Sequence, residues 1–200
     1  MTNTQRACEL DGEWLVVVDY RNGSTRLLDS VAAERWRRSS DVAPVKRVPW
    51  TPSRSINEVP MGWDPPPPVP LRTLAAVGVG LLVTMVAAVL GPRKRRMRRL
   101  VGLVRFATCL SWEQASAPLV EESVNAVRHY GFLPARIACL ESSVAVVVSL
   151  VFQGRKVTWH HGVRSDPLVL HAWLSIDGEP VAEPPSTRRC ATLLTIPSQP

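Results

Sequence analysis

Two short stretches of the chain carry side chains that could together perform thiol chemistry. Cys139 opens an apolar run, 138–143, at a point where a helix is expected to begin. His171 lies in a later stretch, 170–178, whose pattern is typical of a strand entering a turn. Unpaired amides and the helix dipole stabilise a thiolate at a helix N-terminus, and a neighbouring imidazolium stabilises it further. The pair predicts a cysteine nucleophile with a histidine base.

A histidine base usually needs an acid that fixes its tautomer, and two residues are candidates. Asp177 lies at the expected hairpin tip, about 20 Å from His171 at roughly 3.3 Å per residue, and the turn alone explains Asp177–Gly178. Glu183 lies on the returning segment, where a one-residue bulge would set it opposite His171. We therefore predict Glu183 as the orienting acid and keep Asp177 as the alternative.

The remaining histidines and cysteines carry no comparable pattern. His160 and His161 are adjacent, so on a strand they point to opposite faces, and we expect structural roles for both. Cys8, Cys109 and Cys190 lack CxxC spacing, which argues against a zinc cage or a dithiol redox site. The N-terminal residues have no apolar core typical of a signal peptide. A cytoplasmic protein with free thiols is the expectation.

The elements that must position Cys139 and His171 follow from apolar periodicity and from Gly and Pro breaks. We expect four helices followed by antiparallel strands, which is an α+β fold. The predicted buried face of the fourth helix carries Leu140, Val144, Val147, Val148 and Val151. The predicted helices are 74–90, 95–107, 118–130 and 139–152, and the predicted strands are 156–160, 168–176 and 179–183.

The N-terminal residues predict a separate small β module. A strand at 13–20, an Asn22–Gly23 hairpin turn and a second strand at 25–28 precede a helix capped by Asp29 or Ser30. Between 40 and 70 the chain changes character, because it is interrupted by Pro44, Pro49, Pro52, Pro60 and 65–68. We interpret that stretch as a linker, which divides the chain into 1–64 and 70–200.

Charge and hydropathy raise the question of a membrane. The chain has a net charge of +7, partly from the basic run 93–99, which follows 18 uncharged residues at 74–91. That run is long enough for a transmembrane candidate, but it is rich in Ala and Gly and holds four Leu. We therefore favour a buried or membrane-surface helix over a span. Nucleic-acid binding by the basic run is a weaker alternative, and the solvated end of a helix is the plainest one.

The combination of motifs resembles the lasso peptide B proteins, leader-removing cysteine peptidases with a papain- or transglutaminase-like fold. The matching stretches lie between about 130 and 190, and they are 139–145, Gly154, 162–167, 171–173 and 177–178. The resemblance implies Cys139 as the nucleophile and His171 as the base. Glu183 then holds the position of the family's acid, which is commonly an Asp.

The resemblance also extends to about residues 5–40, which are similar to the winged-helix, PqqD-like leader-recognition element fused to some members. It implies two partners, the leader of a ribosomally made precursor peptide and an asparagine-synthetase-like cyclase. It further implies that ATP is used in the coupled reaction. We predict no cofactor or metal bound by this chain, because it has neither a Gly-rich phosphate loop for a nucleotide nor CxxC spacing for a zinc cage.

Two other functions fit the same residues. A transglutaminase or acyltransferase would use the same three side chains with an amine in place of water. A non-catalytic membrane adaptor would instead span the bilayer with 74–91 and bind anionic lipid through the basic run.

Overall fold

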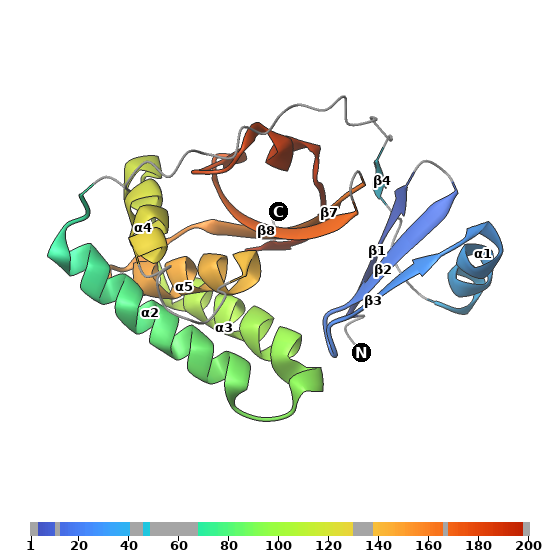
Figure 1. The fold of residues 1–200 in the computed structure, drawn as a ribbon, viewed down its shortest axis with the longest axis horizontal. Coiled ribbons are helices and arrows are strands. Elements are labelled where there is room, and N and C mark those ends of the chain that lie inside the picture. The colour runs from blue at the N-terminus through green and yellow to red at the C-terminus, as the bar shows by residue number, and fades with distance from the viewer. Residues whose placement is uncertain are drawn as a thin grey trace.

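The computed structural model describes residues 4–10, 13–40, 46–48, 68–129, 138–165 and 168–197 (Figure 1). Most of the predicted linker, including Pro44, Pro49, Pro52 and Pro60, lies outside these residues. The described chain forms a small N-terminal sheet with one helix, and a larger part in which helices cover one face of a second sheet. The predicted α+β class is confirmed.

The N-terminal sheet has the strand order β3-β2-β1-β4, with β1 and β4 parallel and the other pairs antiparallel. The predicted hairpin is present, with Gly23 at φ 74° and the Asn22 side chain accepting a hydrogen bond from the Ser24 amide at 2.8 Å. Asp29 caps the helix by accepting from the Ala32 amide. The elements are β1 (Gln5–Leu10), β2 (Trp14–Asp19), β3 (Ser24–Leu28), α1 (Ser30–Ser39) and β4 (Lys46–Val48).

The two faces of this sheet are buried against different partners, because successive strand residues point to opposite sides. Leu15 and Val17 pack under α1 with Ala33. Val16 and Val18 face the other way and join the main core of the protein. The N-terminal sheet and the larger part therefore share one core. The described residues include a single helix in the N-terminal part, so its assignment as a winged-helix module stays a prediction.

The four predicted helices are present, within a few residues at each end. Pro92 and Gly154 follow helix ends as predicted, and Gly154 has a φ of 68°. Gly80 lets α2 lie directly against α5, because a Cβ there would be 2.5 Å from the Ala145 carbonyl oxygen. The helices are α2 (Leu71–Val89), η1 (Arg93–Arg95), α3 (Arg96–Leu110), α4 (Ala117–His129) and α5 (Cys139–Val151).

Helix α5 is buried on almost all sides, not on one face as its Val spacing predicted. Each residue from 143 to 150 is buried, and so is Glu141. The reason is its central place, since α2, α3, α4 and strand β8 all pack against it (Figure 1).

The second sheet has four strands in the order β10-β7-β8-β9, where three were predicted. The strand β10 was missed, and β7 runs on to Arg164 beyond the predicted end at His160. The returning segment 179–183 forms only a two-residue strand, so that prediction is wrong. The elements are β5 (Glu113–Gln114) and β6 (Arg155–Lys156), a parallel pair, with β7 (Thr158–Arg164), β8 (Val169–Ile176), β9 (Glu179–Pro180), η3 (Pro185–Arg189) and β10 (Ala191–Ile196).

Candidate active site

Cys139 is the first residue of α5 and is exposed. Ala138 precedes it with an extended backbone and has no side chain that caps the helix. The unpaired amides of the first turn therefore point out of the N-terminal end of the helix, beside the thiol, where they favour an anion. The thiol itself accepts from the backbone amides of Leu140 and Ala172.

His171 reaches this thiol from β8, at a position paired with Gly162 of β7. Its ring stacks on Trp173, with centroids 5.9 Å apart and planes 11° apart. Trp173 stacks in turn on His160 at 5.2 Å. The alternation of β8 places His171 and Trp173 on one face, and the stack limits the orientations open to the imidazole.

Glu183 is the acid that contacts His171, with 2.7 Å between Nε2 and Oε2. The same carboxylate oxygen accepts a hydrogen bond from the Thr187 hydroxyl at 2.9 Å. Asp177 lies at the tip of the β8–β9 turn with a φ of 50°, at the far end of β8 from His171.

The route that brings Glu183 to His171 differs from the predicted strand bulge. Continued pairing beyond Ser175 and Pro180 would put Glu183 opposite Ala172 instead of His171. The strand ends earlier, because Ala182 adopts a left-handed φ of 55° after the Val181 amide has bonded to the Leu174 carbonyl. Glu183 thus lies in the loop before η3, and Thr187 of η3 holds its carboxylate.

The pKa values of the thiol and the imidazole move in opposite directions. The hydrogen bond to His171 lowers the pKa of Cys139, helped by the two backbone amides and opposed by partial burial. The hydrogen bonds to Cys139 and Glu183 raise the pKa of His171 to about 9. At neutral pH the pair therefore favours thiolate and imidazolium, the reactive state of a cysteine nucleophile. Since Glu183 takes Nε2, the ring nitrogen left for the thiol is Nδ1.

A cavity of about 200 Å³ opens beside Cys139. Its wall is mostly aliphatic and comes from α4, α5, β8 and the loop that carries Glu183. An extended peptide lying across Cys139 could insert one apolar side chain here. The lining includes Val124, Val127, Val146, Leu174 and Val181.

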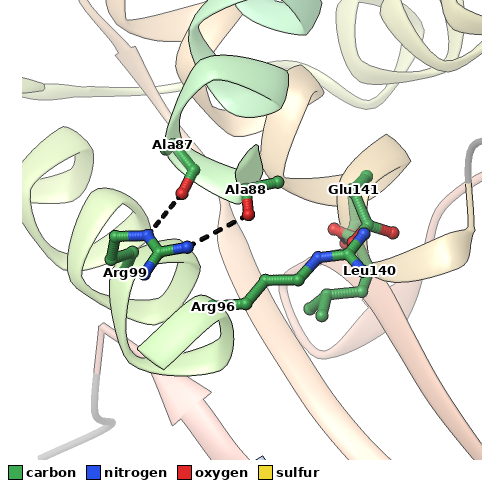
Figure 2. Close-up of polar contacts among 7 residues, drawn as sticks. Ala87, Ala88, Arg96, Arg99, Leu140 and Glu141 are labelled. Atoms are coloured by element: carbon green, nitrogen blue, oxygen red, sulfur yellow. Dashed lines mark hydrogen bonds and ion pairs between the residues drawn. The ribbon is translucent and has the colours of Figure 1, made fainter. Parts of the chain in front are cut away.

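Two polar contacts fix the start of α5. Ser143 accepts a hydrogen bond from the Trp159 ring at 2.9 Å, which ties the helix to β7. Glu141, buried in the first turn, is ion-paired with Arg96 of α3 (Figure 2). Cys139 is therefore carried by a helix that is anchored on two sides close to its nucleophilic end.

The other candidate residues have structural surroundings. His161 is buried and shares a 2.7 Å hydrogen bond with the Tyr20 hydroxyl, while His160 contacts Ser175 at 2.7 Å. Their partners lie on opposite faces of β7, as expected. Cys8 is buried and Cys109 is exposed. Among the residues that the structure describes, no group of three His, Cys, Asp or Glu could hold a metal ion.

Comparison with known proteins identifies the family. The sequence model of the transglutaminase-like superfamily matches residues 81–195, more than half of the chain. This chain belongs to the transglutaminase-like superfamily. The matched span contains Cys139, His171 and Glu183, and superfamily membership supports a cysteine peptidase or an acyltransferase. No curated protein and no solved structure matches the chain.

Three contributors to the candidate site were not found from the sequence. The Ala172 amide lowers the pKa of the thiol, Thr187 holds Glu183, and Trp173 supports the His171 ring. Only Trp173 left a signal, since it shares the alternating face of β8 with His171. The contribution of Thr187 depends on the turn at Ala182, which no local pattern marks.

Proposed function

We propose that this chain is a cysteine peptidase that removes the leader from a ribosomally made lasso precursor peptide. Cleavage frees the N-terminus of the core for ring closure by an asparagine-synthetase-like cyclase. The observation that carries the proposal is the row formed by the Cys139 thiol, the His171 imidazole and the Glu183 carboxylate at the start of α5. The resemblance of residues 130–190 to lasso peptide B proteins supplies the substrate class.

In the first step, the Cys139 thiolate attacks the carbonyl carbon at the leader–core junction, and the carbonyl π electrons move to oxygen. Amides at the N-terminus of α5 are suited to stabilise that oxyanion. The C–N bond then breaks, and the His171 imidazolium gives its proton to the leaving core amine. The leader stays attached to Cys139 as a thioester.

In the second step, neutral His171 takes a proton from water, which attacks the thioester. The C–S bond breaks, and the leader leaves with a new carboxylate. Glu183 accepts from Nε2 throughout and so stabilises the imidazolium that forms again. The thiolate–imidazolium pair is restored.

The N-terminal sheet offers a place for the leader. Strand β3 lies at one end of the strand order, and residues 25–27 are exposed. A peptide in extended form would add to this edge beside α1 through backbone hydrogen bonds. The aliphatic cavity beside Cys139 would then take a side chain close to the cut.

Mass spectrometry of a lasso precursor incubated with the protein, its cyclase and ATP tests the proposal. We expect leader release by the wild type and by Cys109→Ala, a matched control at an exposed cysteine outside the site, but not by Cys139→Ala. Equal cleavage by wild type and Cys139→Ala would exclude Cys139 as the nucleophile. A product carrying an added amine in place of water would indicate acyl transfer. Precursor binding without any cleavage would favour an adaptor.

A further inference from the structure

The outer face of α2, defined as Ala75, Val79, Leu82, Val86 and Val89 with the following Leu90, is apolar and exposed. The alternating spacing of four and three residues places these side chains in one stripe along the helix. Leu82, Val89 and Leu90 retain 64%, 77% and 65% of their exposure. In Figure 1, α2 lies at the edge of the helical layer away from the N-terminal sheet. A continuous apolar stripe of this length marks an interaction surface.

The opposite face of α2 belongs to the core. Val77 is fully buried, Leu81 nearly so, and Gly80 lies against the α5 backbone. Although α2 is long and apolar enough to cross a membrane, crossing would separate this face from α5. Only the outer face is available to a partner while the fold stays intact.

A cationic turn, defined as Arg93, Lys94 and Arg95, stands at the C-terminal end of the outer face. All three residues are exposed, and within the described part of the chain none of them forms a salt bridge. The turn is held against α2 by Arg99, which donates to the carbonyls of Ala87 at 2.6 Å and Ala88 at 3.0 Å. Figure 2 shows Arg99 reaching back to the last turn of α2.

We propose that the outer face of α2 and the cationic turn form a docking site for an anionic phospholipid surface. The apolar stripe enters the boundary between headgroups and acyl chains, and the cationic turn binds the phosphates. Protein interfaces of similar extent normally contain hydrogen-bonding groups, and the outer face has no polar side chain to offer one. Charge and composition together therefore favour lipid over a protein partner.

The test uses the full chain with two kinds of vesicle, phosphatidylcholine alone and an equal mixture of phosphatidylcholine and phosphatidylglycerol. In flotation assays we expect binding to the anionic vesicles to exceed binding to the neutral ones by about tenfold or more, and to weaken with salt. Carbonate should release the bound protein. Equal binding to both vesicles, no binding, or resistance to carbonate would each overturn the proposal.

Two variants probe the two components separately. Leu82→Glu with Val86→Glu places charge in the stripe, and Arg93→Gln, Lys94→Gln and Arg95→Gln together remove three charges from the turn. Both variants should lose binding to anionic vesicles while keeping cleavage of soluble precursor, since none of these residues contacts the site. The matched control is Arg21→Gln, Arg35→Gln and Arg38→Gln, which removes the same charge from exposed positions in the N-terminal part.

The control must bind anionic vesicles nearly as well as the wild type. If it loses binding equally, only net charge matters and the assigned surface is wrong. Sedimentation of the free protein gives the other decisive outcome. If the chain dimerises, and Leu82→Glu with Val86→Glu abolishes the dimer, a second copy covers the outer face and the lipid proposal fails.

Discussion

Two histidines on neighbouring strands have pKa values that are shifted in opposite directions. His171 on β8 lies beside the thiol, while His161 on β7 pairs with Ala172, the next residue along β8. The pKa of His171 is raised to about 9, and that of His161 is lowered to about 4. Neutral pH therefore leaves one ring charged and the other uncharged within the same sheet.

The partners of each ring explain the difference. Burial disfavours the charged form of both histidines. His171 overcomes that cost through bonds to Cys139 and Glu183, which are both anionic partners. His161 has the Tyr20 hydroxyl instead, and burial raises the pKa of Tyr20, so the phenol stays neutral and offers His161 no anionic partner. Burial is therefore the main reason why the pKa of His161 is lowered, and the charge of His171 lowers it further, whereas two anionic partners outweigh burial at His171.

Exchanging each histidine for asparagine should separate the two roles most strongly. We expect His171→Asn to lower kcat/KM for precursor cleavage by about 10³-fold or more, because it removes the proton carrier. The same variant should move the pH dependence of Cys139 alkylation toward that of an ordinary thiol, because the largest cause of the lowered pKa is removed. His161→Asn should retain most of the activity, and comparable losses in both variants would contradict the division.

Removing the charge of the acid should produce the next largest effect. Glu183→Gln is expected to lower kcat by roughly 10²-fold to 10⁴-fold, because the amide stabilises the imidazolium less and permits the wrong tautomer. Glu183→Asp should recover part of the loss. Unchanged cleavage by Glu183→Gln would show that the carboxylate does not orient His171, and Asp177→Asn serves as the matched control.

The pH profile of cleavage provides a third test. Activity requires thiolate and imidazolium together, so kcat/KM should be bell-shaped. The alkaline limb should fall as His171 loses its proton near pH 9, and the acid limb should lie well below the ordinary pKa range of a thiol. An alkaline limb close to pH 6.5, the ordinary histidine value, would contradict the assigned ion pair.

The loss of folding stability at acid pH should depend on His161 rather than on His171. Because its pKa is lowered in the fold, the unfolded state binds the proton more readily, and folding stability is lost as pH falls from about 6.5 toward 4. His161→Asn should flatten this part of the stability curve measured by urea unfolding. His171 has the opposite sign, since its contribution is complete below about 6.5 and is lost as pH rises through about 9.

The smallest expected effect concerns the phenol. Tyr20→Phe keeps the ring but leaves Nδ1 of His161 without its hydrogen-bond partner, which should cost about 1–3 kcal/mol of unfolding free energy. Cleavage at saturating precursor should be nearly unchanged. Thermal melts beside steady-state kinetics would measure both, and a large loss of kcat would show that the two histidines are coupled.

The helices and the position of the nucleophile could be predicted from the sequence because their signals are local. Apolar periodicity placed Cys139 at the first residue of a helix, and Pro92 and Gly154 marked helix ends. The strand β10 was missed because a register shift between Thr192 and Leu194 breaks its alternation. The predicted strand bulge before Glu183 was wrong because Ala182 adopts a left-handed conformation that ordinarily favours glycine.

The hydrogen bond between Tyr20 and His161 has a consequence for protein engineering. It joins the N-terminal sheet to the strand beside the candidate site, within a core to which both contribute. A truncated version that begins after the N-terminal sheet would remove the hydrogen-bond partner of His161 and the strands β1 and β4 that pack against β10. Attempts to replace the N-terminal part of this protein should therefore retain the face of β2 that carries Val16, Val18 and the adjoining Tyr20.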